Sequence, residues 1–448
     1  HRPLSRMWDI YVEINDAKGV VDARKIWVGL PNWTFDDFMW MTIFAPHPGA
    51  GWMGNLYHET ARKHGINSVF TYLIYNMRDL YEHNERLHMQ SVSYFDHFGE
   101  AQGARAAAGE DMDNSKENSN SSLPELSRMY DSIAETGKPL DPEAFPYQFP
   151  QGHHVRDAGM INRKMEDLKV SAKFGSPLYV VTGEEYMLGG GPGGDREFSG
   201  FDDLTTSRFQ AWCREQFKAD LGALNAEWGS TFQSWDEVRG ILIMDAVNKD
   251  QLPRWVSFRS FMRSHVWSQV FIDMSRAMKR VVPEVRTGKV GHDHHDFTRY
   301  KEHMSVSKLY IVPHLNIEWQ QAIKAEVMQS FTDDNTFLLG SASNMKWSHN
   351  FQSEVANVRY PWKMLFMGLN GFDWEELLFA GFGGDSSYTP DFSEKLPFFE
   401  NISREVLHIQ KGIGKLTIAA KPVRSEVAML WGINNHFISR LLPFQENG

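Results

Sequence analysis

Short apolar runs alternate with longer segments of helical periodicity along most of the chain. The apolar run Phe38–Phe44 is followed by a loop with Pro and Gly, by the helical segment Met53–Lys63, and then by a second apolar run, Ile66–Ile74. Strand, helix and strand in this order form one β-α-β unit. Its repetition favours an α/β fold over separate blocks of strand and helix.

Eight such apolar runs can be counted, each short enough to be a strand of a parallel sheet buried on both faces. They span Phe38–Phe44, Ile66–Ile74, Met89–Tyr94, Pro177–Thr182, Val285–Val290, Leu309–Val312, Thr336–Leu339 and Gly371–Trp374. A helical stretch follows each run except the last. The most regular is Thr205–Leu221, for which Gly222 is the expected C-terminal stop. Eight β-α units predict a (β/α)8 barrel, in which the active residues lie at the C-terminal ends of the strands.

Segments outside this pattern suggest the domain organisation. Residues 1–36 end in the extended run Lys25–Leu30 and are expected to belong to a preceding element, and residues 37–418 hold the barrel. Between about residues 100 and 150, Ala, Gly, Asp, Asn and Ser replace the apolar periodicity, which indicates a surface insertion. A new strand over Val423–Leu430 indicates that residues 419–448 begin a following α/β domain. We therefore expect truncated flanking domains on both sides of the barrel.

Composition and charge exclude several partners. The 448 residues carry a formal net charge of −11 without a basic cluster, which argues against nucleic acid, because phosphate binding needs a basic face. No run of about 18 apolar residues occurs, so we expect no membrane partner. The single cysteine, Cys213, excludes an internal disulfide and any multi-thiolate metal site. The chain holds 15 Trp, 30 Phe and 14 Tyr, and such rings either fill a core or line a sugar-binding cleft.

Acidic and imidazole side chains gather where the expected strands end. Glu184 and Glu185 follow the fourth run and Glu318 follows the sixth; the others are His292, Asp293, His294, His295, Asp373, Glu375 and Glu376. Two carboxylates across a cleft are the minimum apparatus for cleaving a glycosidic bond. One donates a proton to the leaving oxygen, and the other stays ionised as nucleophile or as base for water. Neighbours on an extended backbone point to opposite sides, so one of Glu184 and Glu185 can line the centre. A salt-bridged pair on the rim is the alternative.

Sequence motifs around these acids resemble a known family. They are Gly183-Glu184-Glu185-Tyr186, then Phe209-x-x-Trp212, and a Leu-Asn-x-x-Trp-Gly segment that starts at Leu224 and continues to Val238. Together they resemble glycoside hydrolase family 42 and its β-galactosidase-related relatives in clan A. A weaker match joins Trp362-x-x-x-Phe366-x-Gly368 to Gly371–Trp374, so that the similarity spans about Phe38 to Leu416.

The resemblance implies roles for two glutamates. Glu185 takes the position of the general acid/base, and Glu184 stands where the family usually has Asn or Asp. A second carboxylate beside the acid would raise its pKa by like-charge repulsion if both are desolvated. The family's nucleophile follows strand seven, yet the segment from Leu338 to Ala342 contains no acid. We expect Glu318, which precedes Trp319, to be the second catalytic carboxylate, with Glu375 and Glu376 in reserve.

Other polar and aromatic residues at strand ends are candidates for binding sugar. They are Glu184, His292, Asp293, His294, Asn316, Trp319, Trp374 and Glu376. A metal held by His292 and His294 is the alternative for the histidine segment. Lysines and histidines near expected strand ends would make the cleft locally positive, which suits an anionic or sulfated glycan; these are Lys289, His314, Lys346 and His349. The glycine-rich loop from Gly189 to Gly194 lacks the spacing of a nucleotide motif.

We therefore expect a glycoside hydrolase that cleaves β-linked galactosides or a related β-galactan polysaccharide, sulfated or not, without a metal or other cofactor. A non-catalytic carbohydrate-binding barrel and a metal-dependent barrel hydrolase are the alternatives. The resemblance also implies homo-oligomers assembled through a domain that would begin near Val423. A polysaccharide substrate would favour a secreted or periplasmic protein.

Overall fold

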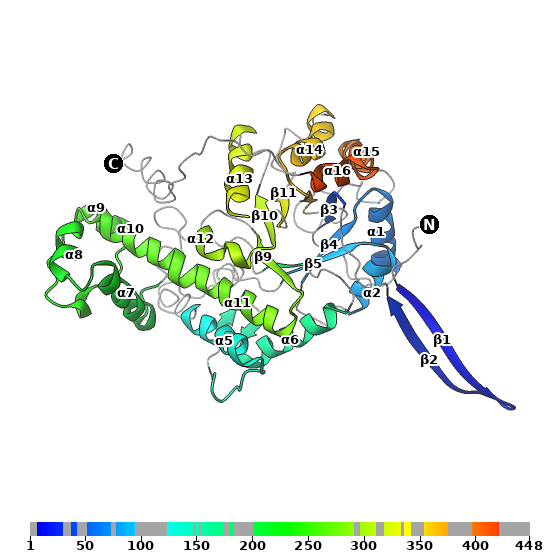
Figure 1. Cartoon of the computed structure of the whole chain (residues 1–448), viewed down its shortest axis with the longest axis horizontal. Helices are drawn as coiled ribbons and strands as arrows, with labels where there is room; N and C mark the ends of the chain where they lie inside the picture. Colours follow the sequence, from blue (N-terminus) through cyan, green and yellow to red (C-terminus); the bar gives the residue numbers. More distant parts are fainter. Residues whose placement is uncertain are drawn as a thin grey trace.

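Eight parallel strands close into a barrel at the centre of the computed structural model (Figure 1). The structure describes residues 7–29, 37–42, 52–72, 78–94, 123–146, 149–151, 154–173, 179–181, 200–290, 296–310, 318–332, 336–341, 354–374 and 397–420. In chain order the barrel strands are β3 (Met39–Thr42), β4 (Ser68–Tyr72), β5 (Gln90–Tyr94), β8 (Tyr179–Val181), β9 (Arg286–Val290), β10 (Val306–Tyr310), β11 (Phe337–Ser341) and β12 (Gly371–Trp374). β12 pairs with β3 and closes the ring, which confirms the expected (β/α)8 barrel.

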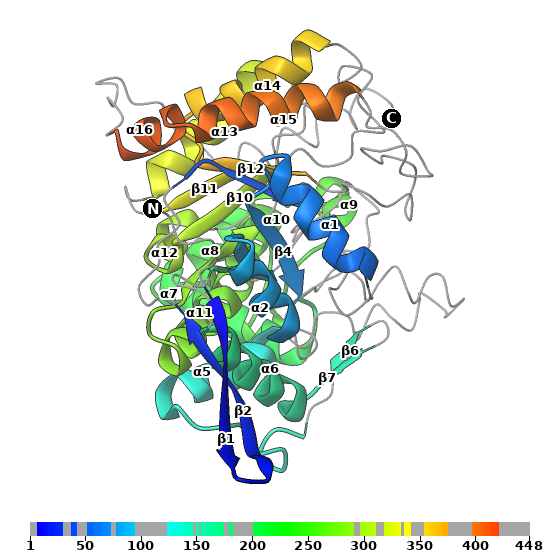
Figure 2. The same cartoon turned by 90° about the vertical axis from the view of Figure 1, so that its right-hand side faces the viewer.

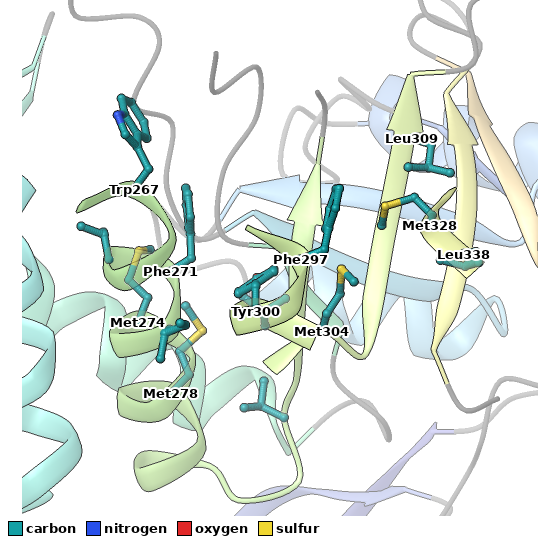
Figure 3. Close-up of a cluster of buried hydrophobic side chains, with 14 of the residues drawn as sticks. Trp267, Phe271, Met274, Met278, Phe297, Tyr300, Met304, Leu309, Met328 and Leu338 are labelled. Carbon is teal, nitrogen blue, oxygen red and sulfur yellow. The ribbon is translucent and has the colours of Figure 1, made fainter. Parts of the chain in front are cut away.

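Successive strand residues alternate between the barrel interior and an outer layer against the helices. Trp40 of β3 points outward, where it stacks on Phe372 of β12 at 5.7 Å between ring centroids and contacts Phe399 at 5.6 Å. Leu309 and Leu338 point outward into the same layer, and Figure 3 shows them beside Met328. Burying each of these large side chains stabilises the fold by about 1.5–3 kcal/mol.

Helices cover the outside of the ring. They are α1 (Trp52–Lys63), α2 (Arg78–Arg86), α6 (Ala158–Ser171), α11 (Ser268–Val281), α12 (Phe297–Tyr300), α13 (Glu318–Phe331), α14 (Glu354–Phe366), α15 (Pro397–Gln410) and α16 (Ile413–Ala419). Figure 2 shows α13 to α16 grouped on one side of the barrel. A 3-10 turn, Lys301–His303, follows α12.

The sixth strand lies earlier in the chain than its apolar run suggested. Leu309–Val312 was expected, whereas β10 spans Val306–Tyr310 and includes the charged Lys308. The strand starts at Val306 because the register with β9 and β11 pairs Val306 with Gly288 and Phe337. A lysine thus lies in the middle of a buried strand.

A helical subdomain stands beside the barrel at one end of the molecule (Figure 1). It consists of α7 (Asp203–Gln216), α8 (Leu221–Trp228), a 3-10 turn (Trp235–Glu237), α9 (Ile243–Asn248) and α10 (Leu252–Phe261). A π-helical turn, Met262–Trp267, joins α10 to α11 in one continuous helix. At 1.5 Å per residue this helix is roughly 45 Å long, whereas five strand residues cover about 17 Å. Because α11 ends just before β9 begins, the far end of the helix projects beyond the C-terminal ends of the strands.

The expected helix stop at Gly222 is wrong. Helix α7 ends at Gln216, and Lys218 and Ala219, with φ of 52° and 59°, turn the chain. Asp220 then caps α8, its side chain accepting a hydrogen bond from the Ala223 amide at 2.9 Å, so Gly222 lies inside a second helix. The left-handed backbone at these two non-glycine residues ends the first helix. A prediction that looks for a glycine at the end of a helix could not find this position.

The expected surface insertion over about 100–150 needs correction in its described part. Helix α5 (Leu123–Thr136) buries Leu126, Met129, Tyr130 and Ile133. It packs against α11, and Figure 1 shows the two helices side by side. Residues 123–136 are therefore part of the core, because an amphipathic helix needs a partner for its apolar face.

Two small hairpins complete the described chain. β1 (Met7–Asp16) pairs antiparallel with β2 (Gly19–Gly29), and Figures 1 and 2 show this ribbon projecting away from the barrel. β6 (Phe149–Gln151) pairs with β7 (His154–Arg156). Strands β1 and β2 lie within residues 1–36 and form a two-stranded sheet of their own. That these residues belong to a preceding element stays a prediction. The expected strand over Val423–Leu430 lies outside the described residues.

Candidate active site

Most of the expected site residues follow barrel strands but lie outside the described residues. β8, the fourth barrel strand, ends at Val181, and Glu184 and Glu185 come shortly after it. His292, Asp293 and His294 follow β9, Asn316 follows β10, and Glu376 follows β12, all outside the described ranges. The structure thus establishes which strand each residue follows in the chain. Active residues of (β/α)8 barrels follow the strands at one face, so a shared site for these residues stays a prediction.

Three expected residues lie on described backbone. Glu318 and Trp319 are the first two residues of α13, and Trp374 is the last residue of β12; their side chains lie outside the description. The helix that Glu318 begins follows β10, which is the sixth barrel strand. The seventh, β11, ends at Ser341. Glu318 therefore does not occupy the strand-seven position that the resemblance assigns to a nucleophile, and its catalytic role stays a prediction.

The π-helical turn anchors the chain directly after the histidine segment. Ser264 donates a hydrogen bond to Asp296 at 2.5 Å, and the Asp296 amide donates to Ser268 at 3.0 Å. Arg299 donates to the Ser264 carbonyl. Burial raises the pKa of Asp296, but the bonds from Ser264 and Thr298 and the charge of Arg263 lower it by more. An ionised Asp296 therefore fixes the position at which the described chain resumes after His292 and His294. π-helical turns are often found beside functional sites.

A buried ion pair lies inside the barrel. Lys308 of β10 and Asp373 of β12 are 1% and 0% exposed, with Nζ and Oδ2 2.8 Å apart. The Lys308 ammonium also lies 5.3 Å from the ring centroid of Phe70 on β4, across the barrel. Both contacts are possible only if Lys308 points inward. Burial and the charge of Asp373 raise the pKa of the nearby Tyr360.

Sequence reasoning named Asp373 among the strand-end acids but missed Lys308. The lysine was placed outside its strand because a charge interrupts an apolar run. A possible signal was its spacing from Val306 and Tyr310, since residues two apart on a strand share a face. Only the barrel closure shows that this face is the interior.

Lys289 does not contribute positive charge to the cleft, which corrects one expectation. It lies two residues after Thr287, whose hydroxyl is 2.5 Å from that of Ser275 on α11, so this face of β9 is the outer one. The Lys289 ammonium lies 4.4 Å from the ring centroid of Phe297 on α12. Lys346, His314 and His349 lie outside the described residues.

The Trp-Gly motif builds the subdomain rather than supplying chemistry. Asn225 accepts hydrogen bonds from the Ser230 hydroxyl at 2.8 Å and the Phe232 amide at 3.0 Å, and it donates to the Phe232 carbonyl at 2.9 Å. Gly229 ends α8 with φ of 63°. Trp228 is buried and stacks on Phe209 at 6.0 Å. The motif thus stabilises the helical subdomain beside the barrel.

Within the described ranges, no group of three or more His, Cys, Asp or Glu side chains is arranged to hold a metal ion. None of the described helices has both the length and the apolar character to span a membrane.

Comparison with known proteins shows the fold. No family model and no curated protein matches the sequence. Among solved structures, the catalytic domain of a β-amylase from Paenibacillus polymyxa aligns with a TM-score of 0.52 and 11% identity, covering 84% of this chain and 99% of that one. An exo-β-agarase aligns at 0.42 and 11%, covering 83% of this chain and 47% of that one. A family 39 glycoside hydrolase from Bacteroides cellulosilyticus WH2 aligns at 0.43 and 7%, covering 92% and 71%. At 11% identity the similarity to the β-amylase domain shows the (β/α)8 fold alone.

Proposed function

We propose that the chain is a glycoside hydrolase that cleaves β-linked galactosides or a related β-galactan, with Glu185 as proton donor. The observation that carries the proposal is topological. The motif Gly183-Glu184-Glu185-Tyr186 comes shortly after the fourth of eight barrel strands, as the resemblance to family 42 requires. The β-amylase whose fold is similar and the agarases that align more weakly are proteins that act on polysaccharides, which agrees with this class of activity.

The second carboxylate is proposed to be Glu318. It starts α13, the helix that follows the sixth strand, so its backbone is expected at the same face of the barrel as the end of β8. Carboxyl groups about 5–5.5 Å apart would give retention of anomeric configuration, and about 6.5–9.5 Å would leave room for an inverting water. Glu375 and Glu376, which follow β12 in the chain, are the competing candidates.

The test is the release of reducing ends from β-galactosides and β-galactans. We expect Glu185→Gln to lower kcat by about 10²–10⁴-fold, because a general acid contributes that much. The matched control is Glu227→Gln, an exposed glutamate on α8, which should keep full activity. Comparing Glu318→Gln with Glu375→Gln and Glu376→Gln then identifies the second acid as the one whose loss abolishes turnover.

Three outcomes would contradict the proposal. Full activity of Glu185→Gln would exclude the assigned acid. Tight glycan binding without hydrolysis by the parent protein would indicate a carbohydrate-binding barrel instead. Loss of hydrolysis in the presence of a chelator would favour the metal-dependent alternative at His292 and His294.

A further inference from the structure

The hairpin formed by β1 and β2 exposes a row of apolar side chains. Ile10, Val12 and Ile14 of β1 are 46%, 42% and 59% exposed. Residues two apart on a strand share a face, so these three side chains form one row along the ribbon. A two-stranded hairpin is at best marginally stable by itself in water, and sheets become stable when further strands or helices cover an apolar face. The exposed row therefore indicates a partner.

The row belongs to β1 alone, because β2 is polar on the same face. Val12 pairs with Arg24, and Ile14 pairs with Asp22. Arg24 donates a hydrogen bond to Asp22 at 3.2 Å, so β2 lines this face with an ion pair. A partner that extends the apolar row must therefore lie beside β1 rather than beside β2.

The two edges of the ribbon also differ. In the described part of the chain this sheet has two strands, so β1 and β2 each have one outer edge. The register shifts between Ile14 and Asn15, which leaves Val21 as an extra residue in β2. Bulges and charged side chains protect edge strands against pairing with another chain. β2 has both, whereas Glu13 is the single charged residue between Ile10 and Ile14.

The stretch from Ile10 to Ile14 is complementary to itself. When two copies of β1 lie antiparallel with Val12 on the two-fold axis, Ile10 faces Ile14 of the second copy, and Val12 faces its own counterpart. On the other face Glu13 meets Tyr11, so no like charges lie directly opposite each other within this stretch. Opposed apolar pairs stabilise antiparallel strands, and opposed like charges destabilise them. A two-fold contact of this kind needs a single surface patch on the chain.

The shape of the molecule leaves room for this contact. β1 contacts α2, and Figures 1 and 2 show α2 at the end of the ribbon nearest to the barrel. The rest of the ribbon projects away from the barrel, and the ten residues of β1 extend for roughly 34 Å. Two barrels can therefore stand at opposite ends of the joined ribbons.

We propose that β1 is a dimerisation strand. Two copies of the chain join their β1 edges antiparallel, with Val12 on the two-fold axis, and form a four-stranded sheet in the order β2-β1-β1-β2. The two apolar rows then become one stripe at the centre of the sheet, and the ion pairs of β2 lie at its rims. An apolar centre with a polar rim is the usual composition of a protein interface.

Sedimentation velocity of the full chain over a range of concentrations is the first test. We expect the parent protein to dimerise reversibly. Val12→Glu should weaken the dimer by about 100-fold or more, because it places two carboxylates opposite each other on the axis. Val21→Glu is the matched control, since it adds the same charge at a valine of β2 that is 62% exposed, and it should leave the dimer unchanged. A parent protein that stays monomeric would overturn the proposal, since something other than a second copy would then cover the row. Equal effects of the two substitutions would also overturn it.

Cysteine cross-linking tests the register, and it still decides if Val12→Glu does not fold. Under oxidation Val12→Cys should give a disulfide-linked dimer, because directly opposed Cβ atoms are about 4.5–5.5 Å apart. The chain's own cysteine, Cys213, is buried. Ile10→Cys and Ile14→Cys should cross-link to each other when the two variants are mixed, and much less when each is oxidised alone. A dimer that Val12→Cys does not cross-link would contradict the pairing of the β1 edges.

Discussion

Asn225 illustrates how one side chain stabilises a turn in the helical subdomain beside the barrel. Its amide makes three hydrogen bonds to the chain after α8, and these close the turn over which Trp228 is buried. The Leu-Asn-x-x-Trp-Gly segment was visible in the sequence and suggested a family. Its role is structural, because the side-chain amide supplies hydrogen-bond partners that the backbone of the turn would otherwise lack.

We expect Asn225→Ala to lower the free energy of unfolding by about 1–3 kcal/mol, because it leaves the partly buried backbone amide and carbonyl of Phe232 without this partner. Urea unfolding followed by tryptophan fluorescence measures the change. Glu227→Ala, at an exposed position two residues later, should stay within about 0.5 kcal/mol of the parent. Equal effects of the two substitutions would show that Asn225 does not hold the turn.

At the scale of elements, the contact between α5 and α11 brings α5 into the core, although the sequence next to this helix is polar and of low complexity. Asp273 of α11 accepts hydrogen bonds from Ser127 of α5 and from Gln269, and Arg276 joins Asp273 to Asp131. Composition around residues 100–150 concealed this helix, since its neighbours in sequence lack apolar periodicity.

The same contact predicts a pH dependence of stability. Burial raises the pKa of Asp273 above its ordinary value of 3.8, and this outweighs the lowering by Ser127, Gln269 and Arg276. The folded protein thus binds this proton more tightly than the unfolded chain does. The contribution of Asp273 to the free energy of unfolding is therefore fully present below its ordinary pKa and falls as pH rises through the raised value.

Asp273→Asn lacks this titration. We expect the unfolding free energy of the parent, minus that of Asp273→Asn, to decrease as pH rises above about 4 and then to level off. Urea unfolding of both proteins between about pH 3.5 and 7 measures the difference, with the exposed Asp203→Asn as control. A difference that grows with pH would contradict the direction assigned to this pKa.

For the whole molecule, closure of the barrel joins strands from opposite ends of the chain. Gly371 of β12 pairs with Met39 of β3, and a Cβ at Gly371 would lie 2.1 Å from the Met39 carbonyl oxygen. Gly288 has the same constraint, with 1.7 Å to the Val306 carbonyl oxygen. The close approach of backbone at these two positions leaves no room for a side chain.

We expect Gly371→Ala to destabilise the protein by at least about 3 kcal/mol, because the clashing atoms are backbone and cannot rotate away. Thermal unfolding by circular dichroism checks this. Gly222→Ala, on the exposed side of α8, should change stability by less than about 1 kcal/mol. A mild effect at Gly371 would mean that β12 and β3 pair less closely than the structure shows.

The sequence by itself determined the number and order of the barrel strands, because buried parallel strands leave short apolar runs that can be read locally. It also placed Glu185 after the fourth strand. Tertiary structure alone decided that Lys308 faces the interior beside Asp373, that Lys289 faces outward, and that residues 123–136 belong to the core. Each of these depends on contacts between segments far apart in the chain, and local periodicity carries no information about such partners.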